Sequence, residues 1–237
     1  MSAAGPAAPA GSVASAAGMA AVPQQYVGLV RGINVGGNNR ITMADFRAVF
    51  EGLGFSDVKT LLQSGNVVFA SARPLGLADV AAIERAFEAA AGFRAGFVVL
   101  SAAQFLAILD QNPLLAVGTD LSRLVVTFLP QAPDAAPAAT SATSATSATS
   151  ATSATSATSA TPAGSSGAAT SFELPEADAT LPEVFAASQY AIYSWHPDGI
   201  SNSRVPATFW KRLGPVYTAR NVNTANKLAA LLRARTA

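Results

Sequence analysis

The chain has 237 residues, enough for one large domain or two small ones, and half of them are hydrophobic although only 8% are aromatic. It contains no cysteine and one histidine, His196, which excludes disulfides and thiol chemistry and argues against a histidine-based metal site or a serine triad. The formal net charge is +1, and no apolar run reaches the ~18 residues of a membrane helix, so we expect a cytoplasmic protein outside the membrane.

Two segments have compositions typical of chains that cannot pack. Residues 1–24 carry no charge and lack the basic start of a signal peptide, so they are expected to form a disordered tail. Residues 141–161 repeat Ser-Ala-Thr in register, and because this repeat has no large apolar side chain to bury, we expect a disordered linker over 133–169. Two folded units are therefore expected, over 25–112 and, interrupted by the linker, over 113–237.

The first unit has the element order β-α-β-β-α-β, that of a ferredoxin-like sandwich. Thr42 with Asp45 begins its first helix as a capping box, and Ser101 with Gln104 opens a further helix that ends at Asn112. The strands and the two helices are predicted, in chain order, over residues 26–34, 43–53, 58–63, 67–70, 78–91 and 96–100.

The second unit is predicted as a less regular copy of the first, which makes the fold class α+β with two ferredoxin-like units. Its last helix carries an apolar stripe and is expected to be capped by Asn223. His196 lies in a turn sequence and is expected at the surface. The other predicted elements are strands over 121–129, 184–187, 190–195 and 215–218 and a short helix over 206–213.

Charge is unevenly distributed along the second unit. Residues 133–198 hold six acidic side chains and no basic one, whereas residues 199–237 hold seven basic side chains and no acidic one. Either the two blocks neutralise each other in the fold, or the basic segment faces an anionic ligand.

Three polar segments, within residues 31–40, 63–66 and 218–224, combine Asn and Gly with Arg or Ser and contain no carboxylate. Guanidinium and amide donors and glycine-exposed backbone N–H groups favour an anion, so these segments are predicted to hold a ligand rather than to perform acid–base chemistry. The candidate ligand-binding residues are Arg31, Asn34, Gly36, Gly37, Asn38, Ser64, Gly65, Asn66, Arg220, Asn221, Asn223 and Thr224.

Topology predicts where these segments lie. The first and second strands of a ferredoxin-like sheet run parallel, so the glycine-rich loop and the 64–66 hairpin are expected at one end of the sheet, and Arg220 and Asn223 are expected to reach them from the second unit. The alternative is a purely structural role, in which the glycines supply positive φ and the asparagines satisfy local backbone. The glycine loop has neither P-loop nor Rossmann spacing.

The same segments carry a resemblance to a known family. R-G-I-N-V-G-G-N, G-F-S-D-V-K-T-L-L-Q-S-G-N-V-V-F and T-A-R-N-V-N-T-A-N-K-L resemble the bacterial family called domain of unknown function 1697 (DUF1697), over residues 26–112 and 218–232. The resemblance implies a two-part α/β protein and no established activity. Leu61 and Val222 stand where the family usually has tyrosine and tryptophan, so any stacking of those aromatic rings on a ligand is lost here.

These observations favour a module that binds a small anionic ligand, such as a nucleotide or a phosphorylated metabolite. The alternatives are an enzyme acting on such a ligand and a structural or interaction protein with no ligand. A nucleic-acid binder is disfavoured by the net charge of +1 and the scarcity of aromatic residues. The sequence predicts no metal site and identifies neither a cofactor nor an oligomeric state.

Overall fold

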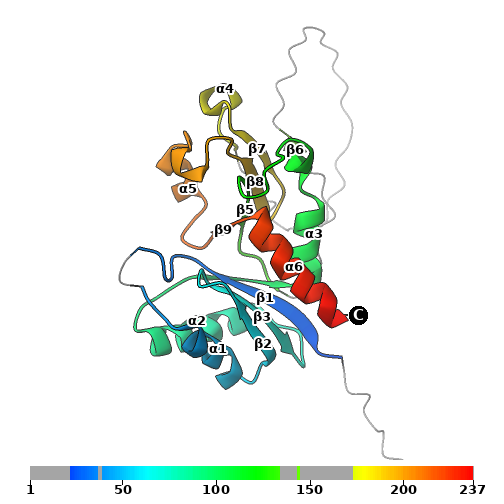
Figure 1. The fold of residues 1–237 in the computed structure, drawn as a ribbon. Helices are drawn as coiled ribbons and strands as arrows, with labels where there is room; N and C mark the ends of the chain where they lie inside the picture. The colour runs from blue at the N-terminus through cyan, green and yellow to red at the C-terminus, as the bar shows by residue number, and fades with distance from the viewer. Residues whose placement is uncertain (1–21, 37–38, 134–142, 145–172, 237) are drawn as a thin grey trace, which may run out of the picture.

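The computed structural model describes residues 22–36, 39–133, 143–144 and 173–236, which form an α+β fold with two antiparallel sheets (Figure 1). The α+β class is thus confirmed. Most of the predicted tail and linker, together with Gly37 and Asn38, lies outside the described residues. Within the predicted linker, Thr143 and Ser144 pair with Ala187 and Ala186 as a short strand, so the expected disorder is wrong at these two residues. No helix in the described part of the chain has the length and apolar character needed to cross a membrane.

The first sheet has the strand order β2-β3-β1-β4, and all neighbouring strands are antiparallel. Its strands are β1 (Gln24–Val30), β2 (Ser56–Leu61), β3 (Asn66–Ser71) and β4 (Phe97–Ser101). Residues 26–30 and 66–71 are buried, because β1 and β3 are the inner strands. The predicted tail over 1–24 is wrong at Gln24, which belongs to β1.

Helices α1 (Met43–Gly52) and α2 (Leu77–Ala91) cover one face of this sheet (Figure 1). As predicted, the Thr42 hydroxyl caps α1 by accepting the Asp45 N–H at 3.0 Å. The core under the two helices is rich in phenylalanine, and Phe50 packs on Phe69 with ring centroids 4.9 Å apart. Burial of this aromatic surface fixes the helices on the sheet.

The second sheet has the strand order β6-β7-β8-β5-β9. Its strands are β5 (Leu124–Phe128), β6 (Thr143–Ser144), β7 (Val184–Ala187), β8 (Ala191–Trp195) and β9 (Thr218–Asn221). The helical segments of this half are α4 (Ala177–Thr180), α5 (Ala207–Arg212), α6 (Val222–Thr236) and the short 3₁₀ turns η1 (Pro113–Ala116) and η2 (Ile200–Asn202).

Helix α6 and helix α3 (Ala102–Asp110) lie between the two sheets (Figure 1). One apolar core runs from the α3-facing side of the first sheet, through both helices, to the inner face of the second sheet. The Tyr193 hydroxyl on β8 donates to the Ile108 carbonyl on α3 at 2.8 Å within this core. The predicted units 25–112 and 113–237 therefore share a hydrophobic core.

The predicted bounds of four strands were wrong. The strand predicted over 58–63 is Ser56–Leu61, and the one predicted over 121–129 is Leu124–Phe128. The first strand ends at Val30 rather than at residue 34, because Gly32 (φ +73°) and Asn34 (φ +56°) turn the chain. The last strand is β9 at residues 218–221, since the ladder with β5 begins at Thr218, not at Pro215.

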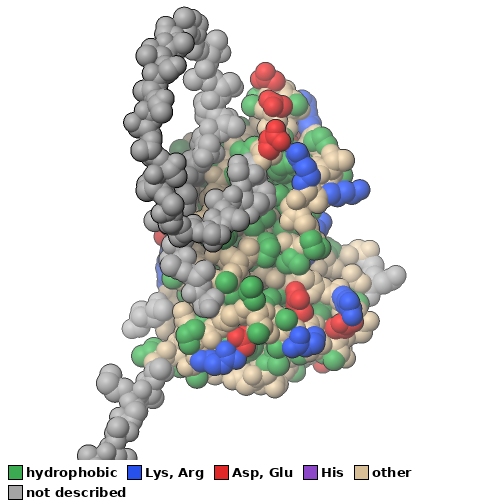
Figure 2. All heavy atoms as spheres, turned by 180° about the vertical axis from the view of Figure 1, so that it is seen from behind, with side chains coloured by type: hydrophobic (Ala, Val, Ile, Leu, Met, Phe, Trp, Pro, Cys, Tyr) green, Lys and Arg blue, Asp and Glu red, His purple; other side chains and the backbone are tan. Residues whose placement is uncertain are grey.

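Opposite charges meet on the second half of the molecule. Figure 2 shows acidic and basic side chains beside each other at the top of the molecule, and Glu173 lies 3.7 Å from Arg212. This ion pair joins the acidic block to the basic one. Because both side chains are exposed, it contributes little to stability.

Candidate functional site

The three polar segments meet at one end of the first sheet. Val30 N–H donates to the Gly65 carbonyl at 2.9 Å, and the Asn34 side chain donates to the Gln63 carbonyl at 3.0 Å, so the loop after β1 lies against the β2–β3 hairpin. Arg220 of β9 reaches the same place from the second sheet. We call this place the junction; it consists of the described residues of 31–40, 62–66 and 217–224.

Arg220 is the centre of the junction, and within the described part of the chain its guanidinium donates only to neutral oxygens. Nε donates to Asn66 Oδ1 at 2.5 Å, and Nη1 donates to Thr218 Oγ1 at 2.6 Å. The remaining acceptors are the carbonyls of Ala219, Val30, Ser64 and Gly65, at 2.8, 2.8, 3.0 and 3.1 Å. All three nitrogens are therefore used within the protein.

The charge of Arg220 is not balanced at close range, because none of these acceptors is a carboxylate. Burial lowers the pKa of Arg220 to about 10, since desolvation disfavours the charged form. At neutral pH the group still carries its proton. Arg220 thus places a positive charge in the junction, and its N–H groups join β9 to β1 and to the β2–β3 hairpin by hydrogen bonds.

The hairpin is built around Asn66 and Gly65. Asn66 is fully buried, and its Nδ2 donates to the Leu61 carbonyl at 2.9 Å and to Ser64 Oγ at 3.1 Å. Gly65 has φ +81°, and a Cβ at this position would lie 2.3 Å from Val30 Cγ1. Only glycine fits there.

Asn34 organises the glycine-rich loop. Its Oδ1 accepts from the Ile41 N–H at 3.0 Å, and its Nδ2 donates to the Ile41 and Gln63 carbonyls at 2.9 and 3.0 Å. Because both side-chain atoms are used, Asn34 closes the loop and fastens it to the hairpin. Gly36 is exposed with φ +57°, and apart from its chain neighbours no described residue lies within 4 Å of the place of a Cβ there.

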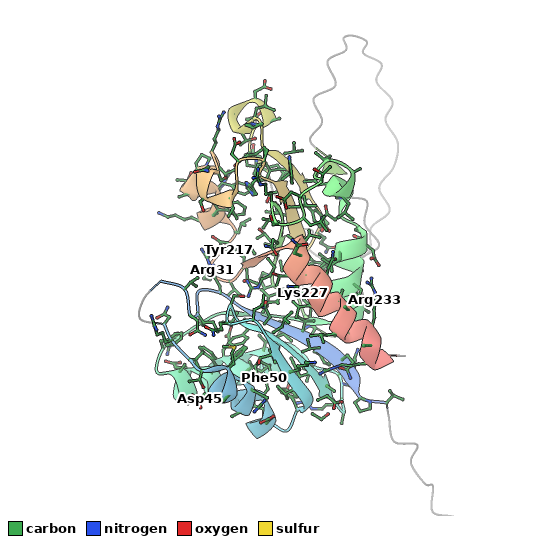
Figure 3. The ribbon with its side chains drawn as sticks, in the orientation of Figure 1. Arg31, Asp45, Phe50, Tyr217, Lys227 and Arg233 are labelled. Atoms are coloured by element: carbon green, nitrogen blue, oxygen red, sulfur yellow. The ribbon has the colours of Figure 1, made fainter. Side chains whose placement is uncertain are left out.

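Arg31 and Tyr217 approach each other from the two halves of the molecule (Figure 3). The Arg31 guanidinium carbon lies 4.1 Å from the centroid of the Tyr217 ring. Arg31 is exposed and Tyr217 is half-buried, so this cation–π contact leaves the edge of the guanidinium open to solvent. Among the described residues Arg31 forms no ion pair.

The turn from β9 into α6 departs from the predicted capping. Asn221 Oδ1 accepts the Thr224 N–H at 2.9 Å, so Asn221 caps the helix, whereas the side chain of Asn223 is exposed. The physical reason is that α6 begins directly after β9, two residues earlier than the sequence indicated. Val222 is buried in the shared core and Leu61 packs against it.

Three other polar side chains, which the sequence did not connect, form a buried hydrogen-bond network where β7 begins and β8 ends. Ser194 Oγ lies 2.8 Å from His196 Nε2, and His196 Nδ1 lies 3.0 Å from Glu183 Oε1. Glu183 Oε2 accepts from Ser203 Oγ at 3.0 Å and from the Arg204 N–H at 3.3 Å. The expected surface position of His196 is therefore wrong.

The order serine, histidine, carboxylate is that of a hydrolytic triad. Ser194, His196 and Glu183 are, however, only 0%, 1% and 6% exposed, so a substrate does not reach the serine in this structure. We interpret these hydrogen-bonded side chains as a satisfied polar network that ties β7 and β8 to residues 203–204. In the described residues no group of three or more metal-ligating side chains forms a metal site.

Comparison with known proteins supports the fold and the family. The structure is similar to "conserved bacterial protein SP0830 from Streptococcus pneumoniae", with a TM-score of 0.56 and 24% sequence identity over 89% of this chain and 99% of that one. No curated protein matches the sequence. A sequence model described as "Protein of unknown function (DUF1697)" matches residues 24–157, which is more than half of the chain. The chain therefore belongs to the DUF1697 family.

Proposed function

We propose that this protein binds a small phosphate-bearing anion at the junction. The observation that carries the proposal is a pair of arginines, Arg31 and Arg220, that flank the end of β1 without an ion-pair partner among the described residues. The two arginines come together at the end of β1, because the Arg220 guanidinium donates to the carbonyl of Val30, the residue before Arg31. Two positive charges at one place attract an anion.

The two arginines have different roles in this proposal. Arg31 offers the N–H groups at the open edge of its guanidinium, and charge-assisted hydrogen bonds of this kind are strong. Arg220 contributes its charge through a partly desolvated environment, where electrostatic attraction is screened less than in water. The predicted contribution of Gly36, Gly37, Asn38, Asn223 and Thr224 remains part of the proposal as donors around the anion.

Binding is favoured over catalysis because the junction has no side chain suited to acid–base chemistry. The junction contains neither a carboxylate nor a histidine, and His196 is buried in the polar network of the second sheet. An enzyme with this site would have to work by positioning and hydrogen-bond donation alone.

A structural or interaction role is the second candidate, and a specific observation favours it. Asn34, Asn66 and Arg220 use their side-chain polar atoms inside the protein. Under this alternative the junction only fastens β9 to the first sheet, and Arg31 only packs on Tyr217.

Two finer points belong to the same proposal. The strand order β2-β3-β1-β4 with two helices on one face supports a ferredoxin-like first unit. The cytoplasmic location expected from the sequence belongs to the same proposal.

Titration calorimetry with inorganic pyrophosphate tests the proposal. We expect wild-type protein to bind and Arg31→Ala to weaken binding by about tenfold or more, since one charge-assisted hydrogen bond is lost. Arg85→Ala is the matched control, because this exposed arginine lies on α2, on the other side of the first sheet. Absence of binding to wild type, or equal effects of the two variants, would favour the structural role.

A further inference from the structure

Arg31 and Tyr217 are the first two members of a longer stack. The Tyr217 ring lies nearly parallel to the ring of Trp210 on α5, with centroids 6.2 Å apart and planes 23° apart. The Arg31 guanidinium covers Tyr217 at 4.1 Å. A stack of guanidinium, phenol and indole thus runs from the junction to α5.

The stack is held in place from both sides. A Cβ on Gly96 would lie 2.9 Å from Val216 Cγ2, so Val216 sits directly on the backbone at the start of β4. On the other side Thr218 begins the ladder with β5. Tyr217 is fixed between these two attachments, and Trp210 packs against the small core of the outer face of the second sheet.

The exposed end of the stack is the guanidinium of Arg31. Its donors lie in the plane of the group, so an anion bound at the edge does not compete with a ring stacked on the face. Guanidinium planes, like aromatic rings, accept nucleobases by stacking.

We propose that the anion bound at the junction is a mononucleotide whose base stacks on the Arg31 guanidinium. This inference rests on the proposed function and adds the class of ligand. One base is favoured over a strand of nucleic acid because the two rings beneath Arg31 stack on each other and are half-buried, whereas Arg31 is exposed.

The test compares ADP with inorganic pyrophosphate, which carry the same number of phosphorus atoms. Stacking predicts that ADP binds about tenfold more tightly than pyrophosphate to wild-type protein. In Arg31→Lys, which keeps a positive charge without the flat group, we expect this ratio to fall to about one. Arg85→Ala should keep the wild-type ratio, and a short oligoadenylate should bind no more tightly than ADP.

Fluorescence gives a second readout in the full chain. The protein has two tryptophans, Trp195 and Trp210, so a change of emission on adding ADP that disappears in Trp210→Phe but persists in Trp195→Phe locates the ligand at the stack. If pyrophosphate binds and ADP binds no better, or if the ratio survives in Arg31→Lys, the nucleotide inference is wrong while anion binding stands. If neither ligand binds, the proposed function itself is wrong. If oligoadenylate binds much more tightly than ADP, the ligand is a strand of nucleic acid and not a mononucleotide.

Discussion

Arg220 and Asn66 are 154 positions apart in the sequence, and Arg220 Nε donates to Asn66 Oδ1 at 2.5 Å. Asn66 is fully buried and in turn holds the β2–β3 hairpin through Leu61 and Ser64. The last strand of the chain is therefore hydrogen-bonded to a turn formed within the first 66 residues. The same contact positions β9 so that Tyr217 reaches Arg31.

Arg220→Ala is predicted to destabilise the protein by about 3 kcal/mol, because it leaves buried carbonyls and Asn66 Oδ1 without a donor. Arg220→Lys should recover only part of the loss, since an ammonium cannot reach acceptors on so many sides. Urea denaturation measures both values. Arg233→Ala is the control, and because Arg233 is exposed beside Asp110 on α3, we expect a change below about 0.5 kcal/mol.

A small effect of Arg220→Ala on unfolding would contradict this view of the junction. Loss of pyrophosphate binding without loss of stability would instead make Arg220 a direct contact of the ligand.

Gly65→Ala is predicted to cost more than Gly36→Ala, although both glycines have positive φ. A Cβ at residue 65 would meet Val30 Cγ1 at 2.3 Å and the Val30 carbonyl at 3.0 Å, whereas a Cβ at residue 36 would meet no described residue beyond its chain neighbours within 4 Å. We expect the second change to cost about 1 kcal/mol from backbone conformation alone and the first about 2 kcal/mol or more. Thermal unfolding of the two variants compares them, and equal midpoints would contradict the packing argument.

Sequence patterns located most elements of the first sheet because the information there is local. Thr42, Asp45 and the spacing of the phenylalanines define α1, and Gly92 in the left-handed conformation ends α2 at 91, as predicted. The meeting of the loop and the hairpin followed from strand direction alone. These features need no knowledge of the second half of the chain.

The errors lie where distant contacts decide the structure. Hydrophobicity placed the last strand at 215–218, but pairing with β5 moves it to Thr218–Asn221 and with it the helix cap from Asn223 to Asn221. The role of Tyr217 could not be predicted from the sequence around it, since its partner Arg31 is remote in the sequence. His196 looked like a turn residue because its partner Glu183, which also accepts from Ser203, comes from another segment.

Asp79 is predicted to contribute to acid sensitivity. The hydrogen bond from Arg73 holds the pKa of Asp79 below its ordinary value, and Asp79 also accepts the Gly76 N–H at the start of α2. The unfolded chain therefore binds a proton more readily, so this stabilisation is present above about pH 4 and is lost as pH falls through the folded-state pKa. Asp79→Asn should lower stability at pH 7 and flatten its decline between pH 5 and 3, as followed by urea midpoints; an unchanged slope would contradict the assignment.

The last prediction concerns the hydrogen-bond network of Ser194, His196 and Glu183. It distinguishes a structural role of this network from a role as a hydrolytic site. Glu183→Ala deprives three donors of their acceptor, and we expect it to cost about 3 kcal/mol.

Ser194→Ala removes one hydrogen bond to His196 Nε2 and should cost only about 1 kcal/mol. If the network is structural, a fluorophosphonate probe will leave wild-type protein unlabelled, because Ser194 is fully buried. Labelling that disappears in both Ser194→Ala and His196→Ala, with both variants folded by circular dichroism, would instead mean that residues 199–213 open over an activated serine.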